Sequence, residues 1–168
     1  MNKNDILRRI RYVFDFNDLK MISIFAKADH QVTRAQISDW LKKEDDPAYQ
    51  KCSDTQLAVF LNGFINDKRG KREGPQPEPE KILSNNAIFM KLKIALNLKA
   101  DDVIKILAVA DAKISKHELS AFFRRADHKH YRECKNQMLR NFLKGLQLKY
   151  RPGQDLESED PWNLASLK

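Results

Sequence analysis

Apolar residues recur along this chain at the spacing of one helix face. Within residues 4–15 this face consists of Ile6, Ile10, Val13 and Phe14. Positions separated by three, four and seven residues lie on one side of an α-helix, so the pattern predicts an amphipathic helix. The same criterion predicts three more helices, near 18–28, from Thr33 onward and near 54–67.

The whole pattern then occurs a second time, 82 residues later. Aligned without a gap, residues 4–69 and 86–151 are identical at 16 of 66 positions, against about 4 expected from residue frequencies of roughly 5–7%. The second copy predicts helices near 86–97, near 100–110, after Ser115 and near 136–150. The sequence therefore predicts an all-α protein of two homologous four-helix modules in tandem, about eight helices in total.

Several identical or similar pairs indicate structure at particular positions. Thr33 with Gln36, and Ser115 with Glu118, have the spacing of capping boxes at helix starts. Asn4 and Asn86 are expected near helix N-caps. Gly63 and Gly145 stand in the middle of the fourth helix of each module, where Gly costs about 0.5–1 kcal/mol against Ala. The same cost at both equivalent positions indicates a close approach of two helices. The alternative is that both glycines occur by chance and that the helices tolerate them.

Composition divides the chain into two modules with connecting segments. The expected boundaries are residues 1–73 for the first repeat, 74–85 for a Pro-rich linker, 86–151 for the second repeat and 152–168 for an acidic tail. Alternating Pro residues favour an extended, semi-rigid spacer. The tail carries Trp162, Leu164 and Leu167 as isolated apolar residues, so it is either mobile or docked through them.

The totals are typical of a globular protein outside the membrane. Hydrophobic residues make up 42% and charged residues 32%, whereas no apolar run approaches the ~18–20 residues of a membrane span. Residues 1–11 lack the apolar core of a signal peptide. Cys52 and Cys134 occupy equivalent repeat positions, which fits a reducing, cytoplasmic setting better than a disulfide framework.

Positive charge is concentrated in the second repeat. The net charge is +8 overall, made up mainly of +3 in residues 1–73, +10 in residues 81–152 and −3 in residues 153–168. A clustered basic face attracts phosphates, so a nucleic acid or an acidic protein is the expected partner. The candidate binding residues are Lys116, Arg124, Arg125, Lys129, Arg132, Lys135, Arg140, Lys144 and Arg151. Against this, charged helix faces often only keep a protein soluble, and only Tyr131 and Tyr150 are available for base stacking.

A second nucleic-acid hypothesis uses the spacing of the second and third helices in each module. The short turns 29–32 and 111–114 give helix-turn-helix spacing, in which the third helix would enter the major groove. The exposed residues of that helix would be Arg34, Lys42 and Lys43, or Lys116, His117, Arg124 and Arg125. A plain packed helical hairpin shares this spacing, and the turn lacks the Gly often found there.

The segment 127–134 contains metal-ligand residue types at short spacing, namely His128, His130 and Cys134. The equivalent stretch of the first repeat keeps Tyr49 and Cys52 but has no His. A structural loop leading into a helix therefore explains the segment better than a metal site, and no metal or cofactor is expected. A helix N-terminus can activate a thiol, but buried packing explains both cysteines better.

No catalytic motif stands out, so the sequence favours a non-enzymatic binding or adaptor module whose second repeat engages the acidic partner. A structural or self-associating interaction module is the alternative. An enzyme is a further possibility, and only Cys134 with His128 and His130 supports it. No membrane contact is expected.

Several motifs together resemble a known bacterial family. They are Asn-Asp-Ile-Leu-Arg-Arg-Ile-Arg-Tyr at 4–12, Trp-Leu-Lys-Lys-Glu-Asp at 40–45, Phe-Leu-Asn-Gly at 60–63, Lys-Arg-Gly-Lys at 68–71, His-Lys-His-Tyr-Arg-Glu-Cys at 128–134 and Leu-Arg-Asn-Phe-Leu-Lys-Gly-Leu at 139–146. These motifs are similar to those of the YehS-like family of unknown function, which is built from two copies of one module. The resemblance covers about residues 1–151 and implies a bacterial, cytoplasmic protein. It transfers no catalytic or binding residue.

Overall fold

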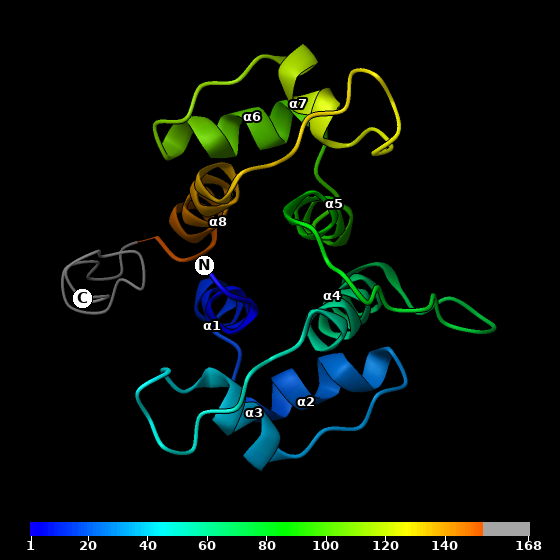
Figure 1. The fold of residues 1–168 in the computed structure, drawn as a ribbon, viewed down its shortest axis with the longest axis vertical. Coiled ribbons are helices and arrows are strands. Elements are labelled where there is room, and N and C mark those ends of the chain that lie inside the picture. The colour runs from blue at the N-terminus through cyan, green and yellow to red at the C-terminus, as the bar shows by residue number, and fades with distance from the viewer. Residues whose placement is uncertain (153–168) are drawn as a thin grey trace.

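The computed structural model describes residues 1–152, which contain eight α-helices and no β-strand (Figure 1). The helices are α1 (Lys3–Phe14), α2 (Asp18–Lys27), α3 (Arg34–Leu41), α4 (Asp54–Arg69), α5 (Asn85–Ala95), α6 (Ala100–Val109), α7 (Lys116–Phe122) and α8 (Asn136–Tyr150). The all-α fold of two four-helix modules is thus confirmed. The hypothesis that the acidic tail docks through Trp162, Leu164 and Leu167 lies outside the described residues.

The two modules pack against each other through their first and last helices. Helix α1 packs against α8 of the other module, and α4 packs against α5. Exchanging the two modules maps one of these pairs onto the other, so the molecule has a twofold arrangement within a single chain. Figure 1 shows α1, α4, α5 and α8 around the middle, with α2 and α3 at one end and α6 and α7 at the other.

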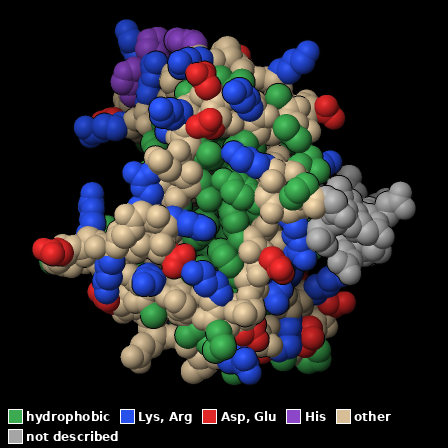
Figure 2. All heavy atoms as spheres, turned by 180° about the vertical axis from the view of Figure 1, so that it is seen from behind, with side chains coloured by type: hydrophobic (Ala, Val, Ile, Leu, Met, Phe, Trp, Pro, Cys, Tyr) green, Lys and Arg blue, Asp and Glu red, His purple; other side chains and the backbone are tan. Residues whose placement is uncertain are grey.

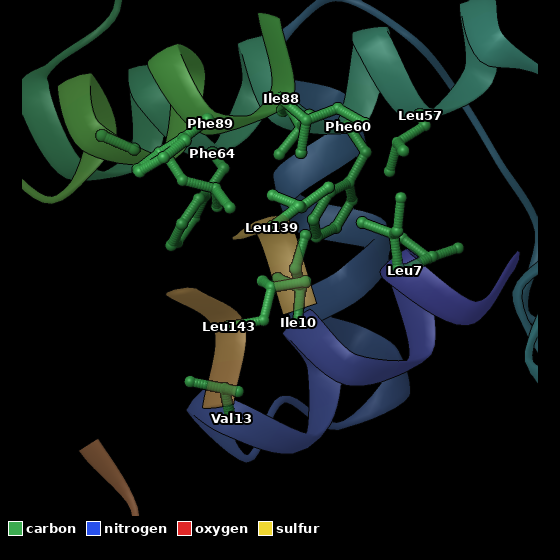
Figure 3. Packing of buried hydrophobic residues seen from close by; sticks show 14 of the residues in the cluster. Leu7, Ile10, Val13, Leu57, Phe60, Phe64, Ile88, Phe89, Leu139 and Leu143 are labelled. Atoms are coloured by element: carbon green, nitrogen blue, oxygen red, sulfur yellow. The ribbon is translucent and has the colours of Figure 1, made fainter. Parts of the chain in front are cut away.

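One hydrophobic core runs through both modules. Side chains from all four central helices meet in it (Figure 3). They include Leu7, Ile10 and Val13 of α1, Leu57, Phe60 and Phe64 of α4, Ile88 and Phe89 of α5, and Leu139 and Leu143 of α8. Because burial of apolar surface is the main stabilising contribution to folding, a core shared in this way couples the stability of the two modules.

The outer helices approach the central ones closely at the two repeated glycines. A Cβ atom on Gly63 would overlap the carbonyl oxygen of Ile24 in α2, and one on Gly145 would overlap that of Ile106 in α6. The expected close helix approach is therefore confirmed in both modules. Both capping boxes are also present, with Thr33 and Ser115 as the N-caps of α3 and α7.

Asp29 and Asp111 directly follow the C-caps of α2 and α6, and they adopt φ of 58° and 59°. This left-handed conformation favours Gly, and Asp is one of the few other residues that adopt it readily. The turn after the second helix thus forms without the Gly that the sequence lacks there.

Candidate nucleic-acid interface

The loop between α7 and α8, residues 124–135, carries the densest group of the proposed basic residues, and we call it the basic loop. Arg125, Lys129, Arg132 and Lys135 are all exposed on it. Lys116 is exposed at the start of α7. Figure 2 shows histidine side chains beside lysines and arginines at the end of the molecule that α6 and α7 occupy in Figure 1.

A buried asparagine holds the backbone of this loop. The side-chain amide of Asn86, on α5, donates to the carbonyl oxygens of Phe122 at 3.0 Å and Arg132 at 2.8 Å, and its oxygen accepts from the Cys134 N–H at 2.9 Å. Asn4 does the same in the first module, donating to Trp40 and Gln50 and accepting from Cys52. Asn4 and Asn86 lie near the N-caps as expected, each two residues after the capping residue, which is Asn2 for α1 and Ser84 for α5.

Internal turns of the basic loop add to this support. The His128 N–H donates to the carbonyl oxygen of Arg125 at 2.9 Å, and the Tyr131 N–H donates to that of His128 at 3.0 Å. The Arg132 N–H donates to the carbonyl oxygen of Ala121 at 3.1 Å. The backbone is therefore fixed by hydrogen bonds while the basic side chains face solvent, so a partner would meet a preformed surface.

Acidic neighbours compensate part of the positive charge. Ion pairs join Lys116 to Asp101 at 3.9 Å, Arg125 to Asp127 at 3.5 Å, Arg132 to Glu118 at 3.6 Å, and Lys135 to Glu133 at 2.9 Å. All eight side chains are more than half exposed. Exposed pairs of this kind contribute only about 0–1 kcal/mol, so a phosphate can replace the carboxylate at little cost.

The remaining proposed residues occupy different environments. Arg124 is half-buried and lies, with Arg125, beyond the end of α7 at Phe122. The two arginines are therefore not on the third helix of the module, as the helix-turn-helix hypothesis supposed. Farther along the chain, Lys144 is exposed on α8, and the half-buried Arg140 donates to Gln137 at 3.4 Å.

Arg151 is engaged inside the molecule. Its guanidinium lies 4.1 Å from the centre of the Tyr12 ring and donates to the Tyr12 carbonyl oxygen at 2.7 Å. It also pairs with Asp15 at 3.6 Å. The 15 residues of α8 separate it from the basic loop by about 20 Å. Arg151 therefore joins the two modules, and the surface that the structure assembles consists of Lys116 and the basic loop.

Neither cysteine has the environment of an activated thiol. Both are buried, and burial raises the pKa of the Cys52 thiol to about 12 and of the Cys134 thiol to about 11. His128 and His130 are exposed, in contrast to Cys134. Within residues 1–152, no group of three or more His, Cys, Asp or Glu side chains is arranged to hold a metal ion. The described helices also include none that is long and apolar enough to cross a bilayer.

A family model described as "Protein of unknown function (DUF1456)" matches the chain twice, at residues 3–70 and 85–152. These two regions are the two modules of the structure. The chain belongs to this family. The curated relatives include the uncharacterized protein YehS of Escherichia coli (strain K12), which is 45% identical over 147 residues. That alignment covers 87% of this chain and 94% of the relative. No solved structure matches the chain.

Proposed function

We propose that this protein is a non-enzymatic binding module that engages nucleic acid through Lys116 and the basic loop of its second module. The observation that supports the proposal is the asymmetry between two equivalent loops. Positions 125, 129, 132 and 135 are all basic. Of the equivalent positions in the first module only Lys43 is basic, and the others are Pro47, Gln50 and Ser53. Both loops are held by the same asparagine contacts, so the difference between them is mainly one of charge.

Contacts with phosphate would dominate such binding. Lys116 and the four exposed basic side chains of the loop imply the release of about five counterions, so the logarithm of the affinity should fall with the logarithm of the salt concentration with a slope of about −3.5 to −4.5. Because exposed aromatic side chains are few in this region, the surface should follow phosphate density rather than base sequence.

The test measures binding of labelled 20-nucleotide RNA and DNA, single- and double-stranded, to the full chain between 50 and 200 mM salt. The decisive variant is Lys129→Gln with Arg132→Gln, which should weaken binding about tenfold and reduce the salt slope by about 2. The matched control is Lys43→Gln with Lys51→Gln, which removes the same total charge from the equivalent loop of the first module.

Equal losses in the two double variants would show that only net charge matters and would contradict the proposed surface. An affinity that does not change with salt would contradict it as well. Poly-glutamate serves as the competitor for the alternative acidic partner. If it displaces RNA at equal charge concentration, the partner is better described as an acidic protein.

A further inference from the structure

A cleft of about 550 Å³ lies between α4, α5 and the segment that joins the modules. It is separate from the basic loop and takes no part in the proposed nucleic-acid binding. Residues of α4 and α5 form two sides, and Arg72, Pro77 and Glu80 of the connecting segment form the third. Figure 1 shows this segment beside α4 and α5. The volume is within the range of about 300–1,000 Å³ that is usual for small-molecule sites.

Apolar side chains form part of the surface between the helices, beside Asn62, Asn66 and Lys91, and this surface is partly open to solvent. Ile65 of α4 and Ala87, Met90 and Ile94 of α5 line it, and Ile94 is 42% exposed. At the equivalent positions of the groove between α8 and α1, the chain has Gln147, Asp5, Arg8 and Tyr12. The twofold arrangement makes the two grooves comparable, and these four positions are all apolar only in the groove between α4 and α5. An exposed apolar surface of this kind often marks a binding site.

The third wall is held in place before any ligand arrives. The Thr55 hydroxyl donates to the Glu80 carbonyl oxygen at 3.1 Å, and the Leu83 N–H donates to the Asp54 carboxylate at 2.8 Å. Asn66 donates to the Gln76 side chain at 2.7 Å. A wall that is already ordered lowers the entropic cost of binding.

Two arginines give the mouth of the cleft a positive charge. Lys91 is compensated, since it pairs with Glu80 at 3.2 Å and donates to Asn62 at 2.6 Å. Arg69 and Arg72 are exposed on the lining, and within residues 1–152 no ion pair or side-chain hydrogen bond engages either guanidinium. Guanidinium groups recognise carboxylates through paired hydrogen bonds, so an apolar cleft with two such groups suits an anion with a hydrocarbon body.

We propose that this cleft binds a small carboxylate that carries an apolar chain, with the carboxylate at Arg69 and Arg72 and the chain against Ile65, Met90 and Ile94. This class of ligand follows from the two guanidinium groups and the apolar side chains that line the cleft together. Neither inorganic phosphate nor an uncharged hydrocarbon satisfies both of them.

The test uses calorimetry on the full chain with hexanoate, octanoate and decanoate below their micellar concentrations. Affinity should rise by up to about fourfold for each added methylene, because burying one methylene away from water contributes about 0.8 kcal/mol of binding free energy. Decanol and decyltrimethylammonium should bind at least tenfold more weakly than decanoate. Equal affinity for decanol, or an affinity that does not depend on chain length, would overturn the proposal.

Two variants locate the site on the molecule. Arg69→Gln with Arg72→Gln should reduce decanoate affinity at least tenfold and leave decanol affinity unchanged. Ile65→Gln, which installs the residue of the equivalent groove, should flatten the chain-length dependence. The control Arg125→Gln with Lys129→Gln removes the same charge from the basic loop and should leave decanoate affinity unchanged. If that control weakens decanoate binding as much as the cleft variants do, the cleft is not the site.

Discussion

At the residue scale, the buried asparagines are the side chains on which the position of the loops depends most. An amide is suited to the task because it offers two donors and an acceptor, and Asn4 and Asn86 use both functions at 1% and 7% exposure. A carboxylate of the same shape accepts but does not donate. This chemistry explains why asparagine stands at the equivalent position in both modules.

Asn86→Asp should destabilise the protein by about 3 kcal/mol or more, because it removes the donor to one buried and one partly buried carbonyl oxygen and places a charge among them. Urea unfolding followed by circular dichroism measures the change. The control is Asn141→Ala on α8, a half-buried residue that accepts a hydrogen bond from Gln137, and it should change stability by less than about 0.5 kcal/mol. If Asn86→Asp lowers the free energy of unfolding no more than the control does, the loop does not depend on the hydrogen bonds of Asn86.

At the element scale, equivalent helices of the two modules differ in how their ends are capped. Ser53 caps α4 and forms a capping box with Gln56. The equivalent N-cap of α8 is Lys135, which makes no side-chain capping bond. The basic loop therefore carries a positive charge at a position where a small polar residue would stabilise α8. This arrangement agrees with a loop whose charge serves binding at some cost in stability.

Lys135→Ser should stabilise the protein by about 0.5–1 kcal/mol, because the serine hydroxyl can accept a hydrogen bond from the first turn of α8. Thermal unfolding at fixed protein concentration measures the gain. Lys135→Ala removes the same charge without adding an acceptor, so it separates capping from electrostatics. If the two variants are equally stable, the missing cap has no energetic effect.

Most helices could be predicted almost to their ends, because the two copies supply two independent readings of one pattern, but α3 and α7 end before some of the lysines and arginines expected on them. The repeated glycines likewise indicated a close helix approach that the carbonyl oxygens of Ile24 and Ile106 confirm. The partners of α1 and α4 could not be predicted, because an apolar face shows that a helix is buried but not what covers it. For the same reason the sequence pattern places Arg151 with the basic surface, although in the structure its contacts are with Tyr12 and Asp15. The sequence also gives no sign that Arg69 and Arg72 line a cleft, because the cleft exists only once α4 and α5 are packed together.

At the scale of the whole molecule, the two modules share one core and are not separate domains joined only by a linker. The core is continuous across α1, α4, α5 and α8, and the contact of Arg151 with Tyr12 fastens one of the two helix pairs that join the modules. A single cooperative transition is therefore expected on unfolding.

Arg151→Ala should lower stability by about 1–2 kcal/mol, because it removes a hydrogen bond and a cation–π contact between the modules. Arg69→Ala is the matched control, since this equivalent residue is exposed and its loss should be nearly neutral. Chemical denaturation of both variants provides the comparison. Equal stability of the two would mean that the contact of Arg151 does not hold the modules together.

The pairing of α1 with α8 also sets the order of events on the ribosome. The two helices that meet in the structure are about 120 residues apart along the chain. At about 5–20 residues per second, α8 is synthesised roughly 6–24 s after α1. During that interval the apolar surface of α1 that α8 later covers lacks its native partner, so α1 completes its contacts only after α8 has been synthesised.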